Sequence, residues 1–187
     1  TAFYMDYEDL QVVRFGPVPG SEFGTFITTN LGSAEIKGFE LESTLYLTDS
    51  FKIDGFVAYL DSEGQDLIIN GGDYSGKELV GAPELSYNLR ASYDKSLAFG
   101  DISASVTLSH EEESRRDYVD DRIKVDERDV VDARIAWANS TGSIEVALWG
   151  KNLTDEDYIS HMYVIGPGGI GVWGAPRTYG VTGTFNF

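Results

Sequence analysis

Hydrophobic residues recur at every second position along much of this chain, and that alternation limits its possible folds more than any other feature. The clearest run lies between residues 84 and 93, where one face of an extended chain would carry Leu85, Tyr87, Leu89, Ala91 and Tyr93. The residues between them are polar or charged. A period of two is that of a β-strand with one apolar and one polar face, whereas helical spacing is hard to find here. The pattern predicts an all-β, antiparallel fold.

The same reading predicts eight strands joined by connections that alternate between short and long. The strands are expected at residues 1–13, 34–48, 51–61, 84–93, 101–111, 130–137, 143–151 and 178–187. The short connections are 48–50, 94–100 and 138–142, and the long ones are 14–33, 62–83, 112–129 and 153–177. Long and short connections therefore lie at opposite ends, as in an outer-membrane β-barrel with short periplasmic turns and long extracellular loops.

Two further patterns favour a transmembrane barrel over a soluble one. Near the short turns, the residues predicted to face lipid are all aromatic: Phe3, Phe51, Tyr93, Trp137 and Phe187. Aromatic girdles of this kind mark membrane interfaces. The opposite face carries small hydroxyl groups and mixed charges, among them Glu40, Arg90 and Arg134, which suit a hydrated lumen and would be costly in an apolar core.

Composition and motifs argue against several other classes of protein. With 14 Lys and Arg against 31 Asp and Glu, the net charge is −17, so nucleic acid is not an expected partner. The chain has no Cys and two His, and we expect no catalytic residue, metal or cofactor.

A glycine pattern at 166–171 resembles a dinucleotide motif, but the sequence after it predicts a strand where that motif needs a helix. The charge-free stretch 158–176 is interrupted by Gly and Pro, which argues against a transmembrane helix.

Two of the long loops hold the candidate ligand-binding residues. The loop at 112–129 alternates cations with acids, and Arg115 and Arg116 are candidates to meet an anionic ligand, although a solvated, salt-bridged hairpin is also consistent with it. The loop at 158–173 carries His161, Tyr163 and Trp173 among glycines, and such rings can stack on a ligand or pack on neighbouring loops.

Four stretches of the chain resemble the C-terminal part of TonB-dependent outer-membrane receptors, in the order in which that family carries them. They are residues 33–42 (SAEIKGFELE), 77–83 (KELVGAP), 149–158 (WGKNLTDEDY) and 176–187 (PRTYGVTGTFNF). The third stretch can turn the chain through side-chain hydrogen bonds of Asn, Thr and Asp. The last resembles the signal read by the barrel-assembly machinery, through Tyr179, Phe185 and Phe187.

The resemblance implies that residues 1–187 are the C-terminal segment of a 22-stranded barrel in the outer membrane of a Gram-negative bacterium. Such receptors surround an N-terminal plug and import siderophores, cobalamin, haem or oligosaccharides, and the TonB complex supplies the energy. This chain shows neither the plug nor the motif that TonB pulls, so its expected partners are outer-membrane lipid, the assembly machinery, a small nutrient ligand and, through a missing N-terminal region, TonB.

Two alternatives come from other classes of protein. Eight strands can close into a small free-standing outer-membrane barrel with a structural or adhesive role. A soluble carrier barrel would instead hold a ligand inside and would not need Leu85, Tyr87 and Leu89 to face away from the lumen.

Overall fold

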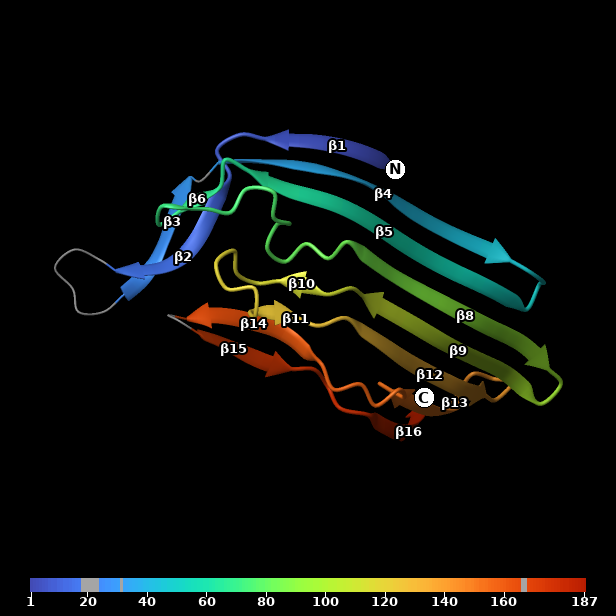
Figure 1. Ribbon diagram of the computed structural model, residues 1–187. Coiled ribbons are helices and arrows are strands. Elements are labelled where there is room, and N and C mark those ends of the chain that lie inside the picture. Colours follow the sequence, from blue (N-terminus) through green and yellow to red (C-terminus); the bar gives the residue numbers. More distant parts are fainter. Residues whose placement is uncertain (18–23, 31, 166–167) are drawn as a thin grey trace.

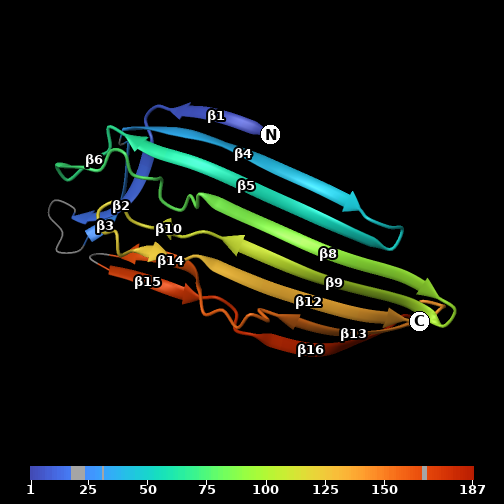
Figure 2. The ribbon, with the colours of Figure 1, turned by 45° about the vertical axis from the view of Figure 1, so that its right-hand side comes forward.

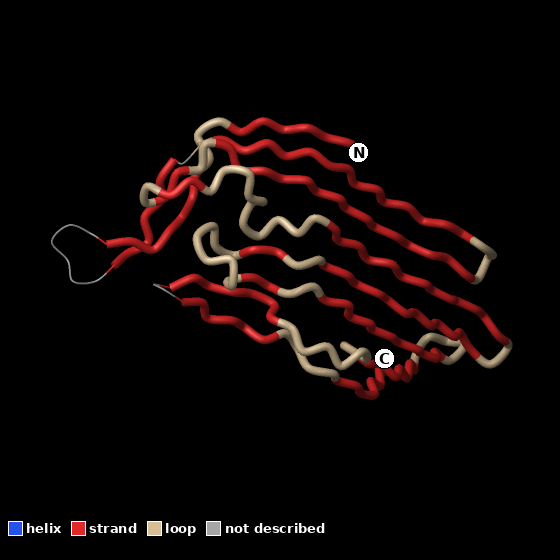
Figure 3. The backbone as a smooth tube through the Cα atoms, in the orientation of Figure 1, coloured by secondary structure: helices blue, strands red, loops and turns tan. Residues whose placement is uncertain are grey.

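The computed structural model describes residues 1–17, 24–30, 32–165 and 168–187, and these ranges contain strands and no helix (Figure 3). Accordingly, no helix in them is long and apolar enough to cross a membrane. Eight strands form one antiparallel sheet in which each strand pairs with the next one along the sheet (Figure 1). These strands are β1 (Ala2–Tyr7), β4 (Ser33–Tyr46), β5 (Phe51–Gln65), β8 (Leu85–Leu97), β9 (Gly100–Glu111), β12 (Arg128–Ala138), β13 (Ile144–Lys151) and β16 (Thr178–Phe185).

The sheet is open, with β1 and β16 as its two edges. Short turns join its strands at one end, and four long loops, L1 to L4, lie at the other (Figures 1 and 2). We define the loops as residues 8–32, 66–84, 112–127 and 152–177. The predicted eight-stranded antiparallel architecture and its sorting of connections are confirmed.

Each long loop carries a small hairpin of its own, which the sequence analysis did not predict. The hairpins are β2 (Gln11–Pro17) with β3 (Gly24–Asn30), β6 (Ile68–Ile69) with β7 (Gly72–Asp73), β10 (Ser114–Arg115) with β11 (Lys124–Val125), and β14 (Ile159–Ile165) with β15 (Gly168–Trp173). β15 overlaps the glycine pattern at 166–171, where the sequence analysis expected a loop, and the strand expected after that pattern is β16. Residues 166 and 167 lie outside the described ranges.

The first predicted strand, 1–13, is wrong in its extent because the chain breaks between β1 and β2. Asp9 adopts a left-handed conformation with φ of 56°, which interrupts an extended strand. The next residue, Leu10, donates its N–H to the carbonyl of Gly32 at 3.1 Å. β1 therefore stays in the sheet, and β2 turns away into L1.

The register separates an apolar from a polar face across the whole sheet. One row of paired residues carries Leu45, Ile53, Ala91, Val106, Ala133, Gly150 and Tyr179. The adjacent row, shifted by one residue, carries Thr44, Asp54, Arg90, Thr107 and Asp132. The two faces predicted from the alternation are therefore present, and a single residue of register separates them.

Aromatic residues border the apolar face of the sheet at both ends. Phe51 and Tyr93 pair directly near the short turns, and Phe39 stacks on Tyr59 near the loops, with ring centroids 5.7 Å apart. Eight residues of tilted strand separate Phe51 from Tyr59, a height of about 20 Å along the barrel axis. This is close to the roughly 25 Å apolar band of outer-membrane barrels.

Phe3 does not belong to the aromatic row in which the sequence analysis placed it. It pairs with Gly38 in the loop-side half of β4, so its side chain lies on the polar face of the sheet. Its ring occupies the space above Gly38, 2.9 Å from where a Cβ would stand. Trp137 shares the apolar face, as predicted, and Phe187 follows β16 as an exposed residue.

Candidate functional site

The four long loops surround a cavity of about 840 Å³ at the end of the sheet opposite the short turns. Apolar residues provide most of its walls: Leu10, Val12, Val13, Phe26, Ile69, Leu79, Val80, Tyr118, Val119, Ile123, Met162 and Tyr163. Polar groups and a glycine complete the lining: Gln11, Asn70, Gly81, Arg116, Asp117, Asp120, Arg122 and His161. A concave, mostly apolar cavity with a few polar groups is the usual form of a small-molecule site.

The structure brings together three of the five residues proposed from the sequence as ligand contacts. Arg116, His161 and Tyr163 line the cavity, and the rings of His161 and Tyr163 meet edge to face at 4.5 Å. Arg115 and Trp173 are not part of the lining. Trp173 lies at the end of β15 and is 70% exposed.

A small hydrophobic cluster shared between L2 and L3 contributes Ile69 and Tyr118 to the cavity wall. Leu67 and Ile69 of L2 pack with Tyr118 of L3, and each is less than 10% exposed. Val12 of β2 and Leu79 pack against the cluster from outside. Residues far apart in the sequence are thus held together next to the cavity by burial of apolar surface.

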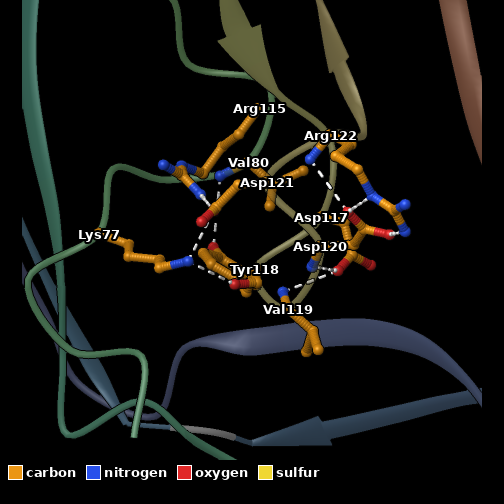
Figure 4. A network of polar contacts seen from close by, with 9 residues as sticks. All are labelled: Lys77, Val80, Arg115, Asp117, Tyr118, Val119, Asp120, Asp121 and Arg122. Carbon is orange, nitrogen blue, oxygen red and sulfur yellow. Dashed lines mark hydrogen bonds and ion pairs between the residues drawn. The ribbon is translucent and has the colours of Figure 1, made fainter.

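A polar network beside this cluster links L2 to L3 (Figure 4). Lys77 of L2 donates to the Asp121 carboxylate at 2.7 Å and to the carbonyl of Tyr118 at 3.1 Å. Arg115 binds the same carboxylate oxygen at 2.8 Å, and the N–H of Val80 donates to the Tyr118 hydroxyl at 3.4 Å. Arg115 therefore has a structural role in L3, as the salt-bridged alternative for this loop requires.

Charge and burial shift the pKa values of the network. The Lys77 ammonium, and after it the Arg115 guanidinium, lower the pKa of the Asp121 carboxyl. The Arg122 guanidinium lowers the pKa of Asp120 to about 2, and burial raises the pKa of the Tyr118 hydroxyl. Both carboxylates thus stay charged at neutral pH and hold their cationic partners.

Asn152 organises the base of L4 as the sequence predicted for the NLTDEDY stretch. Its amide donates to the carbonyls of Glu156 and Ala175, at 2.8 and 3.0 Å, and its side-chain oxygen accepts the Glu156 N–H at 2.9 Å. Asn152 is 3% exposed and has a φ of 49°, a conformation that Asn tolerates well. Asn152 therefore ties the first residues of L4 to Ala175, close to the end of the loop.

Sequence analysis did not identify three residues that belong to the site: Lys77, Gly81 and Tyr118. Lys77 and Gly81 lie in the KELVGAP stretch, whose resemblance to the receptor family was the available signal. Tyr118 stands among charged residues, where no pattern marks it as buried.

The three residues proposed as an assembly signal lie at the C-terminal edge of the sheet. Tyr179 pairs with Gly150 and Phe185 pairs with Ile144 on the apolar face of β16. Both side chains and that of Phe187 are exposed. The assembly signal itself stays a prediction.

Comparison with known proteins identifies the family. A family model described as "TonB dependent receptor-like, beta-barrel" matches residues 1–153. Among solved structures, the ferric yersiniabactin uptake receptor FyuA from Yersinia pestis matches all of this chain and 27% of its own, with 17% identity and a TM-score of 0.78.

Two further receptors match to a similar extent. The ferric preacinetobactin receptor BauA from Acinetobacter baumannii shares 20% identity over 97% of this chain and 26% of its own, with a TM-score of 0.68. The ferric-catecholate import receptor Fiu from E. coli K12 shares 20% identity over 100% of this chain and 24% of its own, with a TM-score of 0.70. The chain thus spans about a quarter of the length of each, and it belongs to the TonB-dependent receptor family as part of the β-barrel.

Proposed function

We propose that the protein containing this chain is an outer-membrane receptor of a Gram-negative bacterium that takes up a small nutrient, and that L1 to L4 collect the ligand. The observation that carries this proposal is the 840 Å³ cavity among the four long loops. Its volume is within the range of small-molecule sites. The chain contributes binding surface and wall, and we expect no catalysis from it.

The two faces of the sheet suit this role. The apolar face, bordered by aromatic residues, would contact lipid, and the polar face would line a hydrated lumen or contact a plug. On the apolar face, charged pairs begin just beyond the Phe39 and Tyr59 rings, where Lys37 lies 3.2 Å from Asp61. This position suits the outer membrane interface, since ion pairs are costly inside the hydrocarbon. Strands outside this chain would close the barrel.

The names of the matched structures suggest which ligands to test. They are receptors for ferric yersiniabactin, ferric preacinetobactin and ferric catecholates, and the copper transporter OprC is also similar to this chain, with 20% identity and a TM-score of 0.69. A metal chelate carried by an organic molecule is therefore the first class of substrate that we propose. The TonB complex would supply the energy through a part of the protein outside this chain, and the barrel-assembly machinery would recognise Tyr179, Phe185 and Phe187.

Uptake by living cells tests this function. Cells that lack the receptor are complemented with the full-length gene and supplied with radioactive iron bound to catecholate, hydroxamate or phenolate chelators, or with radioactive copper. We expect accumulation of at least one complex that requires both the receptor and TonB. Accumulation that is unchanged in cells without TonB would contradict TonB-energised transport, and accumulation of none of these complexes would contradict the metal-chelate class.

A pair of valine substitutions tests whether the cavity is the collecting site. Val80 lines the cavity and Val172 does not, and they are 38% and 46% exposed. Val80→Trp fills the cavity and should lower uptake about tenfold or more, which corresponds to roughly 1.4 kcal/mol of binding. Val172→Trp adds the same bulk outside it and should change uptake less than about twofold. Equal effects would argue against the cavity.

A further inference from the structure

Arg116 differs from the other cations of the long loops because it has no ion pair among the described residues. Every other loop cation with a described side chain lies within 4 Å of a carboxylate. These pairs are Lys77 and Arg115 with Asp121, Arg122 with Asp120, Lys124 with Glu113 and Asp126, and Arg177 with Asp155. Carboxylates outnumber cations in this chain, whose net charge is −17. A cation in a cavity without a carboxylate partner is therefore unexpected.

The local backbone explains why Arg115 and Arg116 behave differently. Arg115 ends β10, and neighbouring residues of an extended chain point to opposite sides. Arg115 reaches Asp121 in the network of Figure 4, whereas Arg116 reaches the cavity. The N–H of Arg116 donates to the carbonyl of Ile123 at 2.8 Å, which fixes the start of its side chain.

Gly81 makes room for the Arg116 guanidinium. A Cβ at residue 81 would lie 2.8 Å from Nη1 of Arg116, and the φ of Gly81 is +74°. The N–H of Gly81 in turn donates to the carbonyl of Arg115 at 2.9 Å. L2 and L3 thus hold the guanidinium against bare backbone, with Nε buried and without a hydrogen-bond partner.

The other polar groups of L3 in the cavity wall are already engaged. Asp117 accepts the N–H groups of Val119 and Asp120, at 2.7 and 2.8 Å. Asp120 binds the Arg122 guanidinium through both carboxylate oxygens, at 2.8 and 2.6 Å. Arg116 is thus the one cation of the described cavity lining without an ion pair, since Arg122 is held by Asp120.

We infer that Arg116 recognises the carboxylate, or a similar planar oxyanion, of a ligand whose remaining surface is largely apolar. The planar guanidinium can bind such a group through two parallel hydrogen bonds. The apolar walls formed by Val80, Tyr118 and Met162 would cover the rest of the molecule. The inference rests on the proposed function, because it concerns the same cavity, and it adds the chemistry of the ligand group and the residue that selects it.

Two small aromatic probes of nearly the same shape, one with a carboxylate and one with a neutral amide, test this inference. Naphthoate carries a carboxylate on two fused rings, and naphthamide replaces the carboxylate by a neutral amide. Binding of each to the full-length receptor in lipid nanodiscs is measured by calorimetry. We expect naphthoate to bind more tightly than naphthamide by roughly 10- to 100-fold, the range for a hydrogen bond to a charged group.

Variants then assign the preference to one side chain. Arg116→Gln should remove the preference for naphthoate and leave naphthamide binding unchanged. Arg122→Gln is the matched control, because Arg122 also lines the cavity but is paired with Asp120, and it should keep the preference. Gly81→Ala should weaken naphthoate binding by displacing the guanidinium.

Several results would overturn the inference. Equal binding of the two probes to the unaltered receptor would do so without any variant, as would binding of neither probe. Loss of the preference in Arg122→Gln but not in Arg116→Gln would assign it to another residue. The binding and uptake experiments can give different outcomes. If Arg116 selects naphthoate but no metal chelate accumulates, the inference about Arg116 is supported and the proposed transport of chelates is contradicted.

Discussion

The sheet and the loop cluster of this chain bury their side chains in opposite ways. In the eight-stranded sheet, the buried apolar residues are the small Ala34, Ala136 and Ala147, while large residues such as Leu41 and Leu148 are more than half exposed. In L2 and L3, Leu67 and Val125 are at most 1% exposed. Among the described residues, the large buried apolar side chains thus lie in the loops.

We attribute this difference to two environments, with lipid around the sheet and water around the loops. A water-soluble sheet would bury its large apolar side chains, because exposing them to water costs free energy. The exposed large residues on the apolar face of the sheet suit contact with lipid. We expect the loops to extend into water, where they need a small core of their own. We expect the sheet to depend on the membrane and the loops to depend on their own packing.

The largest expected effect comes from breaking the loop core. Leu67→Ala removes a side chain that is fully buried, and such a change costs about 2–5 kcal/mol. The cost should fall on the loops, so hydrogen exchange of residues 66–84 and 112–127 should rise while the heat-resistant mobility of the assembled barrel in gels is kept.

Ile68→Ala is the matched control, because Ile68 is 49% exposed. It should change loop exchange little, by about 0.5 kcal/mol or less. A barrel that fails to assemble when Leu67 is replaced would contradict the separation of loop core from sheet.

The next effect tests the sheet. Leu89→Arg places a charge on the apolar face and should impair assembly in the outer membrane by roughly 2–4 kcal/mol near the bilayer midplane. Asn88→Arg lies on the polar face, where Asn88 bonds Ser109 at 2.7 Å, and should be mild. The amount of folded receptor in isolated outer membranes measures both, and equal tolerance would mean that the two faces are assigned the wrong way round.

The comparison also explains which parts of the structure could be predicted from the sequence. Each strand carries its own alternation of apolar and polar residues, so the sequence of one strand is enough to identify its two faces. The eight strands of the sheet were predicted from this alternation. Phe3 was misplaced because its face depends on the pairing of β1 with β4 around Gly38, which no pattern within residues 1–13 encodes.

The cavity could be predicted only in part, because it depends on contacts between loops. Arg116, His161 and Tyr163 were chosen for their chemistry, and they line it. Arg115 has the same chemistry as Arg116, yet Asp121 holds it outside. Nothing in the sequence tells the two arginines apart, because the direction of each side chain is set by the short β10 strand and by the partner loop.

A smaller effect concerns the ionic link between L2 and L3. The pKa of Asp121 is lowered by Lys77 and Arg115, so the charged form of its carboxyl favours the folded loops. This contribution is complete above the ordinary pKa of about 3.9 and is lost as the pH falls through the lowered pKa. We expect the protection of the Val80 and Gly81 amides against hydrogen exchange to drop roughly two- to fivefold over that interval, as for exposed ion pairs.

Asp121→Asn provides the control for this pH dependence. The variant should show the weaker protection already at neutral pH and should not change further on acidification. Amides of the sheet, such as that of Ala91, should keep their protection throughout. A drop that persists in Asp121→Asn would assign the pH dependence to another carboxylate.

The smallest effect separates two aromatic residues of L4 that the sequence could not rank. Tyr163 lines the cavity and Trp173 does not, although Trp173 is the larger and, at 70%, the more exposed ring. Tyr163→Ala should therefore weaken naphthoate binding, whereas Trp173→Ala should change it less than about twofold, as expected of an exposed side chain without a defined contact. Calorimetry on both variants measures this difference. If Trp173→Ala weakened binding as much as Tyr163→Ala, the ligand would have to extend from the cavity to the end of β15 that lies nearest the sheet, and the site would be larger than the cavity.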